Sequence, residues 1–314
     1  MDQIEAVRDF NRYYTQRIGA LDDHYLGQRR PLREARLLFE LGGGADLREL
    51  RTRLGLDSGY LSRLLRSLED QGLVTVRAHA EDGRVRVVML TDSGVRERSE
   101  LDARSRASVE ALLGALTPAE RDDLVAAQTQ VRRLVRRAGV TIAAVPDDSP
   151  EAAECLRSYA AELAVRFPAG YDTSALITPG STESFLVARE AGHPIACVAW
   201  CLLSGPVVPP SAPVDGSGFP CLPGAPAPAP GDPVGTFAEV RHLWVAAGAR
   251  GLGLGRRLLE RVEAEVAERG IRVVRLGTHP ALTEAIGLYL SSGYHPIARY
   301  DSSPYNQLAF ERRW

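Results

Sequence analysis

The sequence predicts two domains: a mainly helical first half with a helix-turn-helix and a β-hairpin, and an α/β second half with a mixed central sheet. Its 314 residues are enough for two separate hydrophobic cores. Residues 2–138 show helical periodicity interrupted by one strand-turn-strand pattern, whereas residues 143–314 alternate strand and helix patterns. Because an arginine-rich helix end and a turn meet near Gly139–Pro150, we expect domains at residues 1–140 and 141–314.

The composition is that of a soluble globular protein, with 45% hydrophobic and 25% charged residues. No apolar run is long enough to span a membrane, and the N-terminus lacks signal-peptide features, so we expect a cytoplasmic protein without a membrane partner. The four cysteines and six histidines form no metal-ligand spacing, so no metal is expected. Residues 1–140 hold 24 arginines against 22 acidic residues, a balance that permits nucleic-acid binding without proving it.

Two long helices at the ends of the first half carry a single apolar stripe. Their stripe residues are Ile4, Val7, Phe10, Tyr14, Ile18, Leu21 and Tyr25 in the first helix, and Leu124, Val131, Leu134 and Val135 in the second. Such helices have little domain core to cover, so we expect them to pair with a second subunit and form a homodimer. Packing within one subunit is the alternative.

Residues 45–74 have the pattern of a helix-turn-helix. Leu47, Leu50 and Leu54 line the first helix, Gly55 allows the tight turn, and Asp57 or Ser58 caps the second helix. On that second helix, four leucines face inward, namely Leu61, Leu64, Leu65 and Leu68. The outward residues are of types that contact phosphates and base edges: Ser58, Tyr60, Ser62, Arg63 and Arg66.

Two β-rich runs follow, joined by a polar Asp82-Gly83 turn. Arg77, Arg84 and Arg86 would project from this hairpin. An arginine at a hairpin tip beside a recognition helix can enter the adjacent minor groove of DNA, where the negative potential of a narrow groove favours arginine.

This order resembles the MarR family of dimeric winged-helix transcription regulators over nearly all of residues 1–138. The resemblance lies in L-x-L-D-S-G-Y-L-S-R-L-L-R-S-L-E-D-Q-G-L-V (54–74), D-G-R (82–84) and L-T-D-S-G (90–94). It implies a homodimer that binds a pseudo-palindromic double-stranded DNA operator, with the recognition helix in the major groove and the wing in the flanking minor groove. A winged helix used only for protein contacts is the alternative.

The second half contains a strand at Val240–Val245, a glycine-rich turn and then an amphipathic helix. The turn reads Arg250-Gly251-Leu252-Gly253-Leu254-Gly255-Arg256. Glycines at a helix start let backbone N–H groups approach a ligand, and the helix dipole suits a pyrophosphate. The pattern is neither a P-loop, since the chain has no lysine, nor a dinucleotide fingerprint, since its glycine spacing differs.

The turn matches R-x-x-G-x-G, and residues 143–314 resemble the GNAT family of N-acetyltransferases. A-E-V-R-H-L-W-V (238–245) before the turn and L-T-E-A-I-G-L-Y-L-S-S-G-Y (282–294) after it extend the resemblance. It implies an acetyl-CoA cosubstrate whose pyrophosphate is held by backbone amides of the turn, namely those of Arg250, Gly251, Gly253, Gly255 and Arg256. Leu252 and Leu254 belong to the same coenzyme-binding stretch. The backbone of Leu243, Trp244 and Val245 would pair with the pantetheine arm. Many relatives have an asparagine that contacts the coenzyme arm where this chain has Leu282, and the adjacent polar residue is Thr283.

The same resemblance implies which residues act as general base and general acid in the transfer of the acetyl group. Glu239 stands eleven residues before Arg250, at the family's general-base spacing, and Tyr289 occupies the position of its general acid. Glu239 as a positioning residue and Tyr289 as a packing aromatic are the alternatives. A segment near the C-terminus has polar side chains that are suited to selecting the amine acceptor: Tyr300, Asp301, Tyr305 and Asn306. The alternative is that this segment is an ordinary surface loop.

Three functional hypotheses remain at this point. The first is a bifunctional protein, a DNA-binding regulator that is also an acetyl-CoA-dependent N-acetyltransferase. The second is a regulator that senses acyl-CoA or a small ligand without turnover, and the third is an enzyme whose winged helix only dimerises. A Pro/Gly-rich stretch, residues 205–235, is expected to be a mobile loop inserted between two strands of the second domain.

Overall fold

The computed structural model describes residues 2–20, 25–27, 30–42, 44–78, 86–172, 176, 180–206 and 234–314. The chain divides into two compact units, Met1–Thr129 and Gln130–Trp314. The predicted boundary at residue 140 lies two residues after the end of a long helix (Pro118–Ala138), whereas the two units divide within that helix. No helix in the described ranges is both long and apolar enough to cross a membrane.

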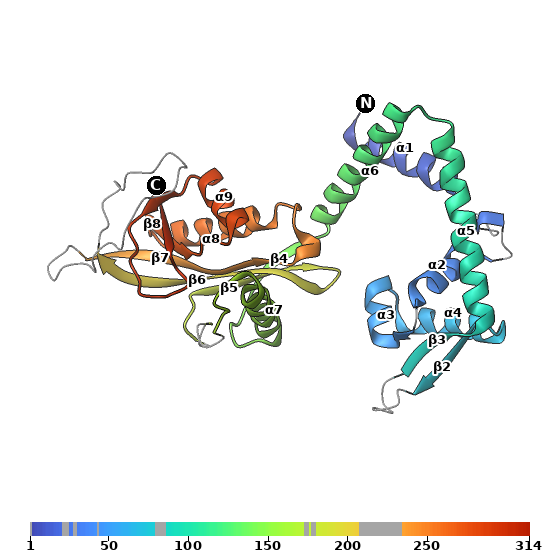
Figure 1. Ribbon diagram of the computed structural model, residues 1–314, viewed down its shortest axis with the longest axis horizontal. Helices are drawn as coiled ribbons and strands as arrows, with labels where there is room; N and C mark the ends of the chain where they lie inside the picture. The colour runs from blue at the N-terminus through green and yellow to red at the C-terminus, as the bar shows by residue number, and fades with distance from the viewer. Residues whose placement is uncertain are drawn as a thin grey trace. The chain divides into compact units, whose positions relative to one another are not determined.

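The first unit is mainly helical (Figure 1). Its helices are α1 (Gln3–Arg17), η1 (Tyr25–Gly27), α2 (Leu32–Leu41), α3 (Leu47–Leu54), α4 (Ser58–Asp70), α5 (Asp92–Gly114) and α6 (Pro118–Ala138), the last continuing into the second unit. Its strands are β1 (Ala45–Asp46), β2 (Val74–Ala78) and β3 (Arg86–Leu90), which form one antiparallel sheet in the order β1-β3-β2.

Helices α3 and α4 form the expected helix-turn-helix. Gly55 has a φ of +63°, a left-handed conformation that favours glycine, and it ends α3. The Asp57 side chain caps α4 by accepting a hydrogen bond from the backbone N–H of Tyr60 at 2.8 Å. The inward leucines of both helices are buried in one core: Leu50, Leu61, Leu64, Leu65 and Leu68.

The hairpin of β2 and β3 pairs Val76 with Val88, and β1 adds a third strand by pairing Ala45 with Val88. The turn at Asp82-Gly83 and the side chain of Arg84 lie outside the described residues. After the hairpin, Thr91 caps α5 and also donates a hydrogen bond to the Gly72 carbonyl at 2.6 Å. A Cβ at Gly94 would lie 2.0 Å from the Leu73 carbonyl oxygen, so only glycine fits this position of the L-T-D-S-G segment.

The apolar stripes of α1 and α6 are exposed on a single chain. The exposed side chains are Ile4, Val7, Phe10, Tyr14 and Ile18 on and just after α1, and Val131, Leu134 and Val135 on α6. Leu21 lies outside the described residues, and Tyr25 belongs to the separate turn η1 rather than to α1.

The second unit is a seven-stranded mixed sheet with helices on both faces (Figure 1). Its strands are β4 (Thr141–Val145), β5 (Ser184–Glu190), β6 (His193–Pro206), β7 (Val234–Val245), β8 (Val273–Thr278), β9 (His295–Ile297) and β10 (Leu308–Arg313), in the order β4-β5-β6-β7-β8-β10-β9. Its helices are α7 (Pro150–Arg166), η3 (Ala247–Ala249), α8 (Leu254–Glu268) and α9 (Thr283–Ser291). Among the described strands only β7 and β8 run parallel, and the other pairs are antiparallel, so the predicted mixed sheet is confirmed.

Alternate residues of the central strands pack against helices on opposite faces. Val198 and Trp200 of β6 join the core beneath α8, whereas Cys197 and Ala199 pack against α7. Strands β6 and β7 are antiparallel neighbours that pair as far as Pro206 and Val234. The residues between them, 207–233, include nearly all of the predicted insertion and lie outside the described residues.

Candidate functional site

The candidate site begins where the two parallel strands of the sheet cease to pair. Strand β7 pairs with β8 only from Ala238 to Val240, although it pairs with β6 through Val245. Between these points β7 has one extra residue relative to β6, because Cys197 pairs with Trp244 while Ala199 pairs with Arg241. His242, in this bulge, has a φ of +52°. The bulge redirects the backbone of β7 and leaves its last residues without a partner from β8.

Next to this point, the turn before α8 presents unpaired backbone N–H groups. Gly251 and Gly253 have φ values of +80° and +75°, which favour glycine. Within the part of the chain that the structure describes, no acceptor bonds the N–H groups of Gly251 or of residues 253–256, since the first intrahelical bond is donated by Arg257 to Gly253. Five free amides at a helix N-terminus, with its positive dipole end, fit a pyrophosphate.

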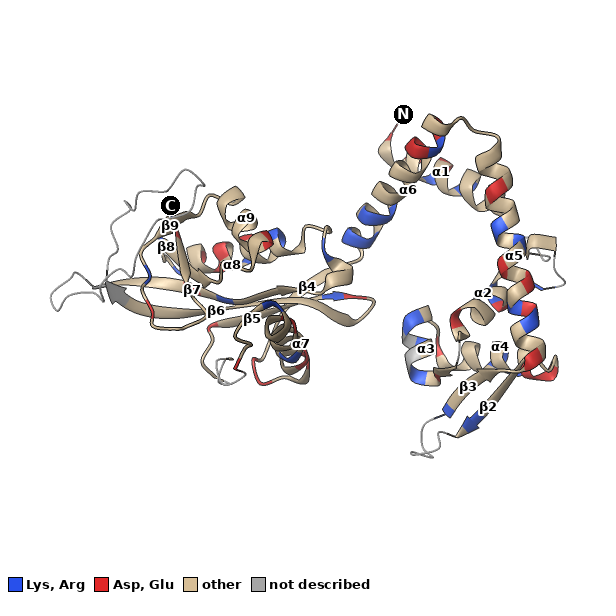
Figure 2. Cartoon of the chain, in the orientation of Figure 1, with Lys and Arg blue, Asp and Glu red and all other residues tan. Residues whose placement is uncertain are grey.

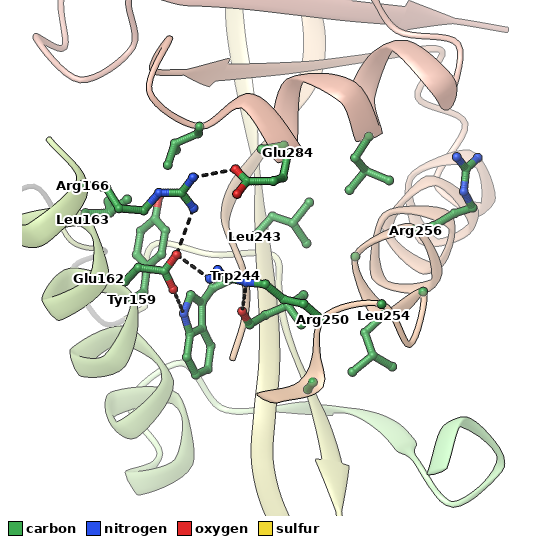
Figure 3. A pocket seen from close by; sticks show the side chains of 18 residues that line it. Tyr159, Glu162, Leu163, Arg166, Leu243, Trp244, Arg250, Leu254, Arg256 and Glu284 are labelled. Carbon is green, nitrogen blue, oxygen red and sulfur yellow. Dashed lines mark hydrogen bonds and ion pairs between the residues drawn. The ribbon is translucent and has the colours of Figure 1, made fainter. Parts of the chain in front are cut away.

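These amides open into a cleft of about 500 Å³ (Figure 3). The cleft is lined by Leu243, Trp244 and Val245 of β7, by Arg250, Gly251, Gly253, Leu254, Gly255 and Arg256, and by residues of α7 and α9. A Cβ at Gly255 would lie 3.0 Å from Leu288 Cδ2 of α9, so this glycine allows α8 and α9 to approach closely. The cleft is mostly apolar beyond the amides, which fits the pantetheine arm of coenzyme A.

Glu162 of α7 is a residue of this cleft that the sequence did not predict. Its carboxylate accepts hydrogen bonds from Trp244 Nε1 at 3.1 Å and Arg166 Nη1 at 3.1 Å, and it forms an ion pair with Arg250 (Figure 3). The Arg256 guanidinium donates to the hydroxyl and the carbonyl oxygen of Ser291 at 2.8 and 3.2 Å. Both arginines of the turn are therefore engaged by the protein, and Glu162 joins α7, the end of β7 and the turn.

A second cleft, of about 460 Å³, continues from the first. The two clefts share five lining residues, namely Tyr159, Leu163, Leu243, Leu282 and Ala285. The second cleft is also lined by Glu239 and Tyr289. The two residues predicted to act on the acetyl group therefore lie beside the cleft that adjoins the amides.

Glu239 is 4% exposed and its carboxylate has several partners. Oε1 accepts a hydrogen bond from the Tyr300 hydroxyl at 2.9 Å, and Oε2 forms an ion pair with Arg241. The charge of Glu239 and burial raise the pKa of Tyr300 well above its ordinary value, burial having the larger effect, so Tyr300 stays protonated and donates. Tyr300 thus holds Glu239, and it is not among the residues that line the cleft.

Tyr289 of α9 is 5% exposed and packs at tilted ring angles against Tyr294 and Phe310, with ring centroids 6.1 and 5.9 Å away. Burial raises the pKa of its phenol above the ordinary value. The hydroxyl is therefore protonated at neutral pH, which a group that donates a proton requires.

Aromatic rings from α7 and the segments after it form one wall of the second cleft. Tyr171 contacts Tyr305 with ring centroids 4.7 Å apart, and Phe167 contacts His279 at 4.3 Å. Tyr159 meets the ring of His242 at 5.4 Å. Burial and then the charge of Arg241 lower the pKa of His242 to about 4, and burial lowers that of His279, so both imidazoles are neutral at pH 7.

Asp301 and Asn306 form the polar part of this wall. Asn306 Nδ2 donates to Asp301 Oδ2 at 2.9 Å, and the Ser303 N–H donates to Asp301 Oδ1 at 2.8 Å. A Cβ at Gly277 of β8 would lie 2.3 Å from Asn306 Cγ, so the absence of a side chain there lets Asn306 enter. Asp301 forms no ion pair with any residue in the described ranges. Because the charges of Glu239 and Arg241 cancel in their ion pair, the charge of Asp301 gives the cleft about one net negative charge.

Two residues of the predicted coenzyme set do not line either cleft. Leu252 is 4% exposed and packs into the core, so only its backbone is near the amides. The Thr283 side chain is exposed and donates to Glu284 at 3.4 Å, whereas Leu282 and Glu284 line the first cleft.

The predicted DNA-reading residues that the structure describes lie on α4 of the helix-turn-helix and on both strands of the hairpin. Ser58, Ser62, Arg63 and Arg66 of α4 are exposed, as are Arg77 of β2 and Arg86 of β3. Figure 2 shows basic segments on α3, β2 and the start of β3. Tyr60 differs from the prediction in being half-buried against the core, and the Arg63 guanidinium lies 5.7 Å from its ring.

Comparison with protein families finds one match in each half of the chain. Residues 153–294 match the model of the Acetyltransferase (GNAT) family, and residues 30–85 match the model of the MarR family. The chain therefore carries one segment that matches each of these two family models. The GNAT match contains β7, the glycine turn, α8 and α9, and the MarR match contains the helix-turn-helix and β2.

Similar proteins are known for both segments. An "IAA acetyltransferase" of Azospirillum brasilense is 36% identical over 76 residues, which are 23% of this chain and 50% of that protein, so the chain spans half the length of this curated relative. An acetyltransferase of the GNAT family from Staphylococcus aureus is 14% identical over 55% of this chain and 98% of its own, with a TM-score of 0.37. FabT of Streptococcus pneumoniae, solved in complex with DNA, is 15% identical over 43% of this chain and 97% of its own, with a TM-score of 0.39.

Proposed function

We propose that the second unit transfers an acetyl group from acetyl-CoA to an amine, and that the first unit binds an operator in double-stranded DNA as a homodimer. The observation that carries the enzymatic part is the row of unpaired amides at Gly251 and residues 253–256, which opens into a cleft continuous with one lined by Glu239 and Tyr289. One cleft fits a pyrophosphate and a pantetheine arm, and the other offers groups for proton transfer.

Coenzyme A would be held by the turn and the end of β7. The amides of Gly251 and residues 253–256 would bind the pyrophosphate, whereas the predicted Arg250 amide already donates to the Ala247 carbonyl. The backbone of residues 243–245, which lies beyond the β7–β8 pairing that ends at Val240, would bind the amide groups of the pantetheine arm. Thr283, next to Leu282, remains a proposed contact for the arm. The thioester of acetyl-CoA supplies the activated acyl group.

The protein's own residues would move the protons in a direct transfer. Glu239 would accept the proton that the attacking amine loses as its C–N bond forms, directly or through a water. Tyr289 would donate a proton to the sulfur as the C–S bond breaks. Tyr300, by donating to Glu239 at 2.9 Å, would hold the carboxylate in place during this step.

The acceptor proposed for the second cleft is a small amine that is protonated in solution. Aromatic faces attract cations, and Tyr171 and Tyr305 contribute such faces beside the unpaired charge of Asp301. Asn306, bonded to Asp301, would orient this carboxylate. Tyr300 would act on the acceptor only through Glu239, because it does not line the cleft.

The enzymatic proposal is tested by release of free thiol from acetyl-CoA in the presence of an arylalkylamine, an aliphatic polyamine, an aminoglycoside and a lysine-containing peptide. We expect amine-dependent release, fastest with a small cationic amine. The apolar side chain of Leu282, which cannot hydrogen-bond the coenzyme arm, favours the alternative that the unit senses acyl-CoA without turnover. Tight coenzyme binding with no release on any amine would establish that alternative.

The DNA-binding part rests on the exposed polar residues of α4 and the arginines of the hairpin. Ser58, Ser62, Arg63 and Arg66, with Tyr60 at their edge, would contact the major groove, and Arg77, Arg84 and Arg86 the flanking minor groove. The exposed stripes of α1 and α6 would form the dimer interface. Sedimentation and gel-shift measurements with the chain's own promoter region test this part; a monomer that shifts no DNA would contradict it.

A further inference from the structure

The last turn of α6 is fixed against the turn that carries the unpaired amides. Arg136 bonds Glu190 of β5 through Nε and Nη2 at 2.7 and 2.6 Å, and its Nη1 donates to the Gly248 carbonyl at 3.0 Å. Arg257 of α8 donates through Nη1 to the Arg137 carbonyl at 3.2 Å. Contacts on two sides therefore fix the backbone around Arg137.

The side chain of Arg137 lies beside the amides. Its Nη1 would lie 3.9 Å from a Cβ placed on Gly253, the residue whose N–H begins the unpaired row at α8. Over the ranges that the structure describes, no hydrogen bond or ion pair engages this guanidinium, whereas Arg250 and Arg256 are engaged by Glu162 and Ser291. Arg137 is exposed, so its charge is available to a ligand.

We propose that Arg137 binds the pyrophosphate of coenzyme A, completing the site from a helix that lies before the GNAT-family segment. A guanidinium offers a planar fork of donors that matches phosphate oxygens, and here it would add a full positive charge to the partial charge of the helix dipole. This inference rests on the proposed function, because it takes the amides of residues 253–256 as the pyrophosphate site.

The consequence concerns α6 as a whole. This helix begins at Pro118 in the first unit and ends at Ala138, and Figure 2 shows basic segments along its C-terminal half. A bound pyrophosphate would restrain the last turn of α6 through Arg137. Binding of coenzyme A would therefore restrain the same helix that carries the exposed apolar residues of the proposed dimer interface, Val131, Leu134 and Val135.

The test is the affinity of the full chain for coenzyme A and for dephospho-coenzyme A, measured by calorimetry. We expect Arg137→Ala to weaken both ligands by the same factor, about tenfold, as for loss of one charge-assisted phosphate contact. Arg132→Ala, an equal change of charge one and a half turns earlier on α6, should stay within about twofold of the wild type.

Each outcome bears on a different claim. Affinities of Arg137→Ala within twofold of the wild type, or a loss confined to coenzyme A with its 3′-phosphate, would overturn the pyrophosphate assignment. A wild type that binds neither ligand would instead overturn the proposed function. Hydrogen exchange gives an independent readout: coenzyme A should slow exchange at residues 135–140 in the wild type and not in Arg137→Ala, and equal slowing in both would contradict the inference.

Discussion

Replacing Glu239 by glutamine is the perturbation that separates its chemical role from its structural one. Glutamine has the same shape and can still accept from the Tyr300 hydroxyl, which lies 2.9 Å from Oε1. It cannot accept a proton from an amine at neutral pH. A general base contributes roughly 10²–10⁴-fold to the rate, so we expect kcat to fall by at least about 10²-fold.

The structural cost of this substitution should be small by comparison. Glutamine leaves Arg241 without its ion pair, but the Arg241 side chain is 40% exposed, so water compensates much of the loss and about 1 kcal/mol of stability is at stake. That is a minor part of the ~5–15 kcal/mol by which domains are stable, so the variant should stay folded and bind coenzyme A with nearly unchanged affinity. A loss of turnover without a loss of binding is therefore the signature of a base.

The assay is amine-dependent thiol release over a range of pH, with coenzyme affinity measured on the same preparations. Glu151→Gln is the matched control, because Glu151 also pairs with a partly exposed arginine, Arg189, and lines neither cleft. Turnover of Glu239→Gln within about threefold of the wild type would refute the base assignment and leave Glu239 as a residue that only positions the substrate amine.

Three other predictions follow from single contacts. Gly277→Ala should displace Asn306, whose Cγ would lie 2.3 Å from the new methyl, and raise KM for the amine about tenfold with unchanged coenzyme affinity; kinetics and calorimetry check this, and the reverse pattern would contradict it. Arg66→Ala should weaken operator binding about tenfold and lower the salt slope by about 1 in a salt titration, and unchanged affinity at fixed salt would remove Arg66 from the interface. Glu190→Gln should cost about 0.5–1 kcal/mol of unfolding free energy at pH 7, measured by denaturant titration. A hydrogen bond from Arg136 lowers the pKa of Glu190, so this stability is present above the ordinary pKa of 4.5 and lost as the pH falls through the lower folded value. The two proteins should therefore converge in acid, and a difference that persists there would disprove the cause.

The elements predicted from the sequence are those with a strong local signal. The leucines of α4 repeat at helical spacing and all four are buried, so the helix and its inward face could be read from residues 58–70. The turn at residues 250–256 combines glycines with the start of an amphipathic helix, and its backbone has the free amides that this combination indicates. Both features depend on neighbours in sequence.

Elements that depend on distant contacts gave no such signal. Helix α5 spans 23 residues but buries only Gly94 and Leu101, so it has no apolar stripe to detect. Strand β1 has two residues and exists only through its pairing with β3. The sequence has a helical pattern at residues 45–46, but these residues form a strand because Ala45 pairs with Val88 in the folded protein.

The site is incomplete in the sequence for the same reason. Glu162 and Tyr159 of α7 line the clefts and contact Trp244 and His242 of β7, which lie some 80 positions later in the sequence. No spacing rule connects residues so far apart. Arg137 belongs to the end of a helix that the sequence assigned to the first domain, and only the fold brings it beside Gly253. A cluster of arginines at residues 132–137 was the available signal, but it did not indicate a ligand.

The most direct test of the account is the position of coenzyme A in a crystal structure of the complex. The pyrophosphate oxygens should lie about 2.7–3.2 Å from the amide nitrogens of residues 253–256, with the pantetheine arm along residues 243–245 and its thiol toward Tyr289. Coenzyme A bound elsewhere, with those amides left facing solvent, would contradict it.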